Sequence, residues 1–534
     1  MSKRSIYKPL LYTTTVRNPE RYKDFIHLLK KFDGQILNAE LIENFERETF
    51  KCGLYRPTKR IPESVKNKWG KTKNGDFGEY ALTDAETKAI YDGNDPNLHK
   101  DIAGHKEAGF KKGWESRFET QFKLLKTLGF VYYQINEPIR FSNTGNLLAS
   151  VVSIKYEKDG SVTRTIIYPQ NEQIAFLQAF ARQQRNNPFI RELNDNIPLI
   201  LLLKVIRLLN KDKNYNGCGI SYKEIPLLLF WKDNDANALY NRIIQLRTQY
   251  GYTPTPEIIT DICTNEILGG FKKFKTKSII SEYPDDFVRK MRMTGLISFR
   301  GGGRFIDINH KEDSTIDYII NKYSKYQKYN SEQEYFNYMS TVDKHLFVYN
   351  ETQINRNEAS KKLTEWTKIF AWGKIKEELE HLIKKRPTKD NILKFIDTPS
   401  RLEFLTAIAI KIKFPQIEVI PNYPIDDTGL PTSTAGGGMG DIECFEASKA
   451  ILIEVTMAQG RTQTVMEVWP IERHLESFIE KYQLDSQCVF IAPSIFNDTE
   501  RQIKFVKADK GLIIRPYKVK DFIGFLETHN FLYL

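Results

Sequence analysis

Two acidic residues in the last third of the chain, Asp441 and Glu454, are the side chains best suited to do chemistry. Asp441 opens a short predicted strand, and Glu454 interrupts the otherwise apolar strand Ala450–Thr456. Because a turn at 446–449 joins the two strands as an antiparallel pair, both carboxylates can lie at the same end of a sheet. A buried carboxylate is costly unless something pairs with it, and a hard divalent cation such as Mg²⁺ prefers carboxylate oxygens. The pattern therefore predicts a divalent-metal site.

Two other kinds of site are disfavoured by the residue types present. The glycine-rich segment Gly436–Gly440 invites comparison with a phosphate-binding loop, but no Gly-Lys-Ser/Thr follows it. The five cysteines are scattered and form no CxxC pair or Cys/His cluster. We therefore expect neither a nucleotide-binding loop of that type, nor a structural zinc site, nor a disulfide framework.

The acidic pair looks like the Asp…Glu-x-Lys core of the restriction-endonuclease superfamily, with Thr456 in the place of the usual lysine. Glu403 lies on a predicted helix upstream of the sheet, where that fold places a further acid. Glu467 and His474 follow the second strand and are seven residues apart, which is two turns on one face of a continuous helix. Because Pro470 lies between them, that helix is either kinked at the proline or begins there.

The elements around these residues alternate between short strands and helices, which is typical of an α/β domain. Predicted strands lie at 417–420, 441–445, 450–456, 488–495 and 511–519, and predicted helices lie at 360–386, 399–413 and 471–482.

In the first half of the chain, a basic helix precedes a glycine-rich turn. Asp285–Met293 is a predicted helix with acids at its start and bases at its end, which suits the helix dipole. Predicted strands at 296–299 and 305–308 follow, joined by Arg300-Gly-Gly-Gly-Arg304. A basic helix followed by such a hairpin is typical of a winged-helix module that binds DNA. An ordinary helix with a surface hairpin fits the same residues. A β-hairpin is also predicted within 147–168.

The charge balance favours a polyanionic partner. Lys and Arg total 79 and Asp and Glu total 67, which gives a net charge of +12. Basic residues gather with aromatic ones at 56–73 and 106–117, an arrangement that suits a phosphate backbone. A surface that serves only solubility is the alternative for the net charge.

The chain resembles the AlwI family of type IIS restriction endonucleases, which also contains strand-specific nicking enzymes and large subunits of heterodimeric restriction enzymes. The resemblance runs nearly end to end. It rests on the segments Tyr12–Pro19, Gly34-Gln35, Trp114–Arg117 with Leu128–Val131, Arg289–Gly295 with Arg300–Arg304, and the acidic segment 436–456.

The resemblance implies a multidomain α+β protein. A helical, winged-helix-like N-terminal region would recognise DNA, and a C-terminal restriction-endonuclease-like α/β domain would carry a central mixed sheet flanked by helices. The expected parts are DNA-recognition subdomains at 1–185 and 186–310, a helical linker at 311–355 and a cleavage domain at 356–534.

The family's catalytic positions fall on Glu403, Asp441, Glu454, Glu467 and His474. Mg²⁺ held by Asp441, Glu454 and the backbone carbonyl of Val455 would polarise the scissile phosphate and acidify a bound water. His474 would orient the water or stabilise charge, and Glu403 would hold a second metal or a metal-bound water. Purely structural roles for His474 and Glu403 remain open.

For DNA, arginine is the commonest reader of guanine. The candidates for base contacts are Arg289, Arg292, Arg300 and Arg304, Lys290 is expected on phosphate, and Arg117 belongs to the basic and aromatic segment.

We therefore expect a Mg²⁺-dependent endonuclease that binds a short asymmetric site in double-stranded DNA and cuts a few bases away. One chain supplies one acidic pair, so a second cut would need self-association or a small nuclease subunit. The alternative is a non-catalytic winged-helix DNA-binding protein with a degenerate nuclease domain, which the threonine at 456 favours. No secretory signal and no apolar run of roughly 20 residues is visible, so a cytoplasmic protein without a membrane partner is expected.

Overall fold

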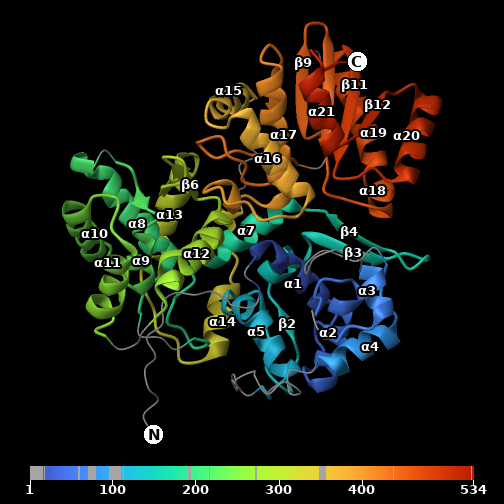
Figure 1. Ribbon diagram of the computed structural model, residues 1–534. Helices are drawn as coiled ribbons and strands as arrows, with labels where there is room; N and C mark the ends of the chain where they lie inside the picture. Colours follow the sequence, from blue (N-terminus) through green and yellow to red (C-terminus); the bar gives the residue numbers. More distant parts are fainter. Residues whose placement is uncertain are drawn as a thin grey trace. The chain divides into compact units, whose positions relative to one another are not determined.

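The structure is a computed structural model that describes residues 16, 18–57, 60–69, 80–94, 110–111, 113–190, 194–215, 217–270, 274–347, 356–436, 438–530 and 532–533. Parts of the basic segments 56–73 and 106–117, and the start of the segment 12–19, lie outside these residues. The chain forms two compact units (Figure 1). Unit 1 is Met1–Val152 with Asn171–Val348, and unit 2 is Ser153–Gln170 with Tyr349–Leu534.

Unit 1 is mainly helical. The region expected to be a helical linker forms α13 and α14, which belong to this unit. The helices and strands of unit 1 are α1 (Tyr22–Lys30), α2 (Ala39–Lys51), α3 (Glu63–Trp69), α4 (Asp84–Gly93), α5 (Trp114–Thr127), β1 (Val131–Tyr132), β2 (Arg140–Phe141), α6 (Asn143–Ala149), α7 (Pro169–Phe180), α8 (Pro198–Lys211), β5 (Ile220–Ser221), α9 (Ile225–Phe230), α10 (Ala236–Tyr250), α11 (Pro256–Asp261), α12 (Tyr283–Arg292), β6 (Ile297–Arg300), β7 (Phe305–Ile308), α13 (Asp313–Tyr323) and α14 (Glu332–Ser340).

The predicted basic helix and hairpin of unit 1 form α12, β6 and β7. The two strands are antiparallel, and β5 pairs with the other edge of β7, so the sheet order is β5-β7-β6. Glycines 301 to 303 all have positive φ, which lets the tight turn form between the strands. A buried ion pair ties α10 to this sheet, because Arg247 Nε lies 2.8 Å from Glu224 Oε1 and Arg247 Nη2 donates to the carbonyl of Gly219.

Unit 2 is built on a five-stranded mixed sheet, which confirms the predicted sheet class. The strand order is β12-β11-β10-β9-β8, in which β10, β11 and β12 are parallel and β8, β9 and β10 are antiparallel. The helices and strands of unit 2 are β3 (Val152–Tyr156), β4 (Val162–Ile166), α15 (Arg356–Thr367), α16 (Trp372–Ile383), α17 (Thr398–Lys413), β8 (Glu418–Pro421), β9 (Ile442–Glu446), β10 (Lys449–Val455), α18 (Arg461–Met466), α19 (Val468–Tyr482), β11 (Asp485–Ala492), α20 (Asn497–Lys510), β12 (Ile514–Lys518) and α21 (Val519–Thr528).

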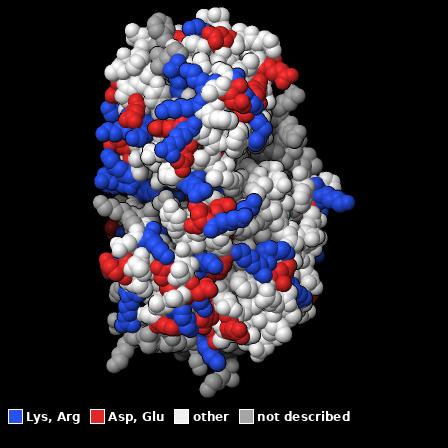
Figure 2. All heavy atoms as spheres, turned by 90° about the vertical axis from the view of Figure 1, so that its right-hand side faces the viewer, with Lys and Arg blue, Asp and Glu red and all other residues white. Residues whose placement is uncertain are grey.

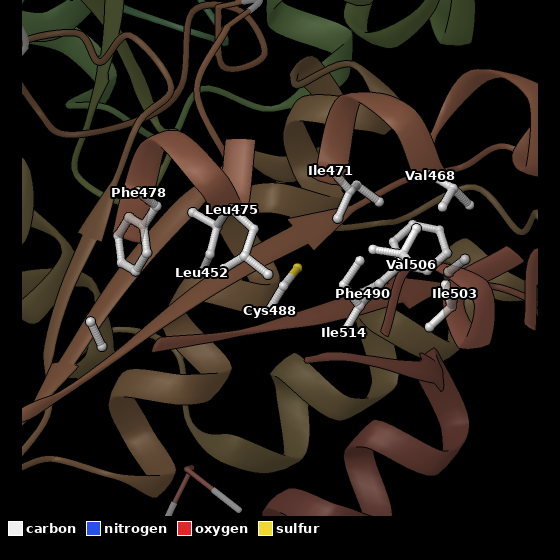
Figure 3. Packing of buried hydrophobic residues seen from close by; sticks show 12 residues of the cluster. Leu452, Val468, Ile471, Leu475, Phe478, Cys488, Phe490, Ile503, Val506 and Ile514 are labelled. Carbon is white, nitrogen blue, oxygen red and sulfur yellow. The ribbon is translucent and has the colours of Figure 1, made fainter. Parts of the chain in front are cut away.

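The apolar core on one face of this sheet holds α19 and α20 in place. Leu452 of β10 and Phe490 of β11 lie among Leu475 of α19 and Ile503 of α20, all of them buried (Figure 3). Strand side chains alternate between the two faces, so Glu454, two residues beyond Leu452, belongs to the face that α19 covers. The burial of Leu452 in this core therefore places the Glu454 carboxylate on the face of β10 that is covered by α19.

The predicted hairpin at 147–168 is present as the antiparallel strands β3 and β4, while the start of that segment belongs to α6. The hairpin contacts α18 of unit 2, where Arg461 forms an ion pair with Asp159 and Thr462 Oγ1 donates to the carbonyl of Val162. Among the described residues, every helix is too short or too polar to span a membrane.

Candidate active site

The strand register brings Asp441 and Glu454 to one end of the sheet. The final antiparallel pair of β9 and β10 is Ile442 with Ile453, so Asp441, which directly precedes β9, lies opposite Glu454, the next residue of β10. Opposed residues on antiparallel strands share a face. The backbone N–H of Val455 donates to Asp441 Oδ2 at 2.7 Å, which fixes the aspartate against β10. The structure thus brings together the two carboxylates that the sequence pattern singled out.

Helix α19 adds Glu467 and His474 to this pair. The helix begins at Val468 with Pro470 in its first turn, where proline is tolerated because no N–H is needed there. Of the two alternatives for the proline, the helix therefore begins near it. His474 Nδ1 lies 2.9 Å from Glu454 Oε1. Glu467, just before the helix, accepts a hydrogen bond from Thr456 Oγ1 at 2.8 Å.

Glu403 reaches the same site from α17. It is buried, and its Oε2 accepts a hydrogen bond from the backbone N–H of Ala435 at 3.0 Å. The α17 helix starts at Thr398, with Asp397 capping it and a proline in its first turn. Glu403 thus connects α17 and the loop before β9 to the site formed by β9 and β10.

The four carboxylates perturb one another strongly. Burial, and then the charge of Glu454, raise the pKa of Asp441 well above its ordinary value. Burial and the charge of Asp441 raise the pKa of Glu403 in the same way, and burial with the charge of Glu467 raises that of Glu454. Burial also raises the pKa of Glu467, against the hydrogen bond from Thr456. Each carboxylate therefore resists ionisation beside the others unless a cation is bound.

His474 does not supply that cation near neutral pH. Burial lowers the pKa of its imidazole, although the charge of Asp441 opposes the shift. The ring is therefore mainly neutral at pH 7. With Nδ1 against Glu454, Nε2 is the ring atom that remains to accept a proton.

The residues present fit a hard divalent cation better than any other charged group. Carboxylate oxygens are the ligands that Mg²⁺ prefers, and a divalent cation would relieve the repulsion that raises these pKa values. Within the described part of the chain, no three or more His, Cys, Asp or Glu side chains are grouped closely enough to hold a metal ion by themselves. The ligand set expected from the sequence, Asp441, Glu454 and the carbonyl of Val455, has only two side chains and does not need such a group.

Sequence reasoning missed the residues that hold the Asp441 backbone. The side chain of Asn422 donates to the carbonyl of Gly440 at 2.7 Å, and its backbone N–H donates to the carbonyl of Asp441 at 2.9 Å. No spacing or composition signal connects an asparagine at 422 with an acid at 441, because the contact depends on how β8 pairs with β9.

The structure separates the expected DNA-contacting residues into buried and accessible ones. Lys290 has 0% exposure and forms an ion pair with Asp286 one helical turn away. Arg292 is also buried and donates from Nη1 to the carbonyl of Ile297 at 2.7 Å. Lys290 is thus paired within α12, whereas Arg292 joins α12 to β6, and a DNA contact by these two buried side chains stays a prediction.

The remaining candidates are more accessible. Arg304 is exposed at the glycine turn, with its Nε 3.3 Å from the carbonyl of Gly301. Arg300 is half-buried, 3.6 Å from Asp307, and Arg289 is half-buried on α12. Arg117 is half-buried and lies over the ring of Trp114, with its guanidinium carbon 5.5 Å from the ring centroid.

Gly440 is required at this site because no side chain fits there. A Cβ atom at Gly440 would lie 2.3 Å from Leu452 Cδ1 and 3.0 Å from Glu454 Oε1. We predict that Gly440→Ala lowers the free energy of unfolding by about 1–3 kcal/mol and also displaces Glu454. Denaturant unfolding checks this, with Gly436→Ala as the matched control, since a Cβ at Gly436 meets nothing within 4 Å. Equal stability of the two variants would contradict the prediction.

Comparison with known proteins gives one family. Residues 126–368 and 349–525 match the family of the AlwI restriction endonuclease, whereas no curated protein matches the chain. Among solved structures, the small subunit of the heterodimeric restriction endonuclease R.BspD6I is 24% identical, with 28% of this chain and 76% of that chain covered and a TM-score of 0.24. Restriction endonuclease FokI is 10% identical over 99% of this chain and 98% of its own, with a TM-score of 0.26. FokI bound to DNA is 12% identical over 99% and 97%, with a TM-score of 0.23. Because the matched stretches span more than half of the 534 residues, the chain belongs to the AlwI restriction endonuclease family.

Proposed function

We propose that this protein is a type IIS site-specific DNA endonuclease that uses Mg²⁺ to hydrolyse a phosphodiester a few bases from a short asymmetric site. The observation that carries the proposal is the buried cluster of Glu403, Asp441, Glu454 and Glu467 with His474 at one end of the sheet. Buried carboxylates that raise one another's pKa are typical of a functional site and are expensive in a merely structural one.

Asp441, Glu454 and the carbonyl of Val455 are the groups proposed to hold Mg²⁺. When bound, Mg²⁺ supplies a Lewis acid that polarises the scissile phosphate and lowers the pKa of a water. The hydrogen bond from the Val455 N–H to Asp441 Oδ2 keeps the Asp441 carboxylate next to Val455, whose carbonyl is the third proposed ligand. Glu403, whose position is fixed by the N–H of Ala435, would hold a second metal or a water on the first.

In place of the usual lysine, His474 is proposed to accept the proton of the attacking water, with Glu467 beside it. A neutral imidazole that donates from Nδ1 to Glu454 leaves Nε2 to accept that proton. Thr456 keeps Glu467 oriented through its hydroxyl. No positive side chain is then needed at 456, so the threonine there does not by itself favour a degenerate nuclease.

Unit 1 is proposed to recognise double-stranded DNA through a winged-helix-like module. Helix α12 is followed directly by the hairpin of β6 and β7, as a wing follows the recognition helix, and β5 completes the sheet β5-β7-β6, which supports this proposal. On the face shown in Figure 2, basic and acidic side chains are interspersed, so that face does not stand out as a single basic surface. Base reading is assigned to particular residues, Arg304 first, because direct readout needs side chains that reach the base edges. The cytoplasmic location stays a prediction.

The carboxylates test the nuclease directly. We predict that Asp441→Asn and Glu454→Gln abolish cleavage of supercoiled plasmid in Mg²⁺ but keep specific binding in a gel-shift assay. Without metal, both variants should unfold at or above the wild-type temperature, because each removes one charge from a repelling cluster.

Glu472→Gln is the matched control for these variants. This buried acid of α19 pairs with Lys510 at 2.5 Å and belongs to no part of the cluster. The control should lose stability and keep cleavage. Wild-type protein that leaves a broad set of plasmids intact would instead favour the non-catalytic DNA-binding alternative.

Arg304 tests recognition. We predict that Arg304→Ala weakens binding to the specific site by about 1–3 kcal/mol, the size of one arginine–base contact. Its unfolding temperature should not change, because the side chain is exposed. Arg501→Ala, which removes an exposed arginine of α20, is the control and should bind normally. If the variant loses specific and non-specific affinity equally, Arg304 contacts a phosphate rather than a base.

One acidic cluster per chain predicts ordered strand cleavage. The two strands of a duplex run in opposite directions, so one bound site presents only one of them correctly. Nicked circles should therefore accumulate before linear DNA at low protein concentration. Linear product that rises more steeply than enzyme concentration would indicate self-association, whereas a persistent nick would indicate a separate small subunit. If ultracentrifugation shows that the protein is a monomer and both strands are nevertheless cut at the same time, this prediction is contradicted.

A further inference from the structure

Tyr423 presents a buried hydroxyl that has no use in the packing of unit 2. Its side chain is 0% exposed, and its hydroxyl oxygen has no hydrogen-bond partner among the described residues. A buried hydroxyl without a partner destabilises a fold, and phenylalanine would fill the same space without that cost. Such an atom in a native protein calls for an explanation through a bound molecule or a catalytic role.

The position of Tyr423 places this hydroxyl near the acidic cluster. Tyr423 follows Asn422, whose backbone N–H and side chain hold the carbonyls of Asp441 and Gly440. Its ring also lies beside Phe404, the neighbour of Glu403 on α17, with 6.4 Å between the ring centroids. Tyr423 is therefore next to the segment that carries Asp441 through Asn422, and it contacts the helix that carries Glu403 through Phe404.

Glu403 is the acidic residue whose charge acts on this hydroxyl. Burial, and then the charge of Glu403, raise the pKa of Tyr423 well above its ordinary value, so the hydroxyl keeps its proton and can act only as a neutral donor and acceptor. Glu403 accepts the N–H of Ala435 with Oε2, and among the described residues no bond is made by its Oε1. Among the described residues, the Tyr423 hydroxyl thus has no acceptor and Glu403 Oε1 has no donor, and no direct hydrogen bond joins the two. The contact of the Tyr423 ring with Phe404, the neighbour of Glu403, brings the two residues into one part of the unit.

We propose that Tyr423 is a positioning residue, whose hydroxyl and the Glu403 carboxylate share one water molecule that orients Glu403 toward Asp441 and Glu454. One water can accept from one group and donate to the other, which satisfies both without moving either side chain. Glu403 is then fixed at both oxygens, by Ala435 on one and by the shared water on the other. This assignment rests on the proposed nuclease function of the same site.

Tyr423→Phe tests the proposal, because it removes only the hydroxyl. The variant should unfold close to the wild-type temperature, since phenylalanine fills the same space and the hydroxyl bonds to no other protein group among the described residues. Its single-turnover rate on plasmid DNA with Mg²⁺ should fall roughly five- to tenfold, the size expected for one hydrogen bond. Mg²⁺ alone should raise the unfolding temperature of the wild-type protein and should raise that of the variant less.

A double-mutant cycle shows whether the hydroxyl acts through Glu403. In a Glu403→Gln background, adding Tyr423→Phe should cause no further loss of rate, because coupled residues do not contribute additively. Tyr482→Phe is the matched control. The hydroxyl of Tyr482 donates to Glu443 Oε2 at 2.7 Å, outside the acidic cluster. That control should lose stability and keep its rate, the reverse of Tyr423→Phe.

Each result separates this proposal from the proposed function. A Tyr423→Phe variant that cleaves and responds to Mg²⁺ like the wild-type protein overturns the positioning role and leaves the nuclease in place. Additive losses in the double-mutant cycle overturn the link to Glu403. Wild-type protein with no cleavage and no Mg²⁺-dependent rise in unfolding temperature overturns the function, and the role of Tyr423 with it.

Discussion

The concentration of four carboxylates in a buried corner of one sheet is the constraint on which the rest of unit 2 depends. Asp441 and Glu454 lie at the same end of β9 and β10; the charge of Glu467 raises the pKa of both, and their own charges raise the pKa of Glu403. Such a cluster disfavours the folded state unless protons or a cation neutralise it. The surrounding structure must therefore supply enough apolar burial to hold the acids together.

That burial comes from the core between the sheet and helices α19 and α20. Leu452 and Glu454 are two residues apart on β10 and therefore share a face, Leu452 in this core and Glu454 in the site. Burial of the leucine thus helps to offset the cost of burying the carboxylate on the same strand. Gly440 allows the loop before β9 to approach both side chains. His474 reaches Glu454 because its neighbour Leu475 is fixed in the same core. Stability and chemistry are thus coupled through adjacent residues on one strand and one helix.

Unit 1 uses its basic residues in two ways. Lys290 and Arg292 are buried and hold α12 to its own acid and to β6, and Arg247 holds α10 to Glu224. A buried cation with a good partner stiffens the elements that it joins, since removing either partner leaves an uncompensated charge. Among the candidate residues that the structure describes, Arg304 at the glycine turn is exposed, and it is therefore the one that the proposed base contact relies on first. The net charge of the chain thus does not by itself indicate how many of these cations are accessible.

The sequence by itself determined the local elements and the candidate acids. The strands at 441–445 and 450–456, the helix after them and the hairpin of the strands at 296–299 and 305–308 follow from apolar patterning, helix-dipole charges and turn residues, which act over a few positions. The pairing of Asp441 with Glu454 was also predictable, because one short turn joins their strands. Only the tertiary structure decided that Lys290 is buried, that Asn422 holds the Asp441 backbone and that the Tyr423 hydroxyl is buried without a partner among the described residues. These contacts join residues on different elements, and their geometry depends on strand order and helix packing, which no local pattern encodes.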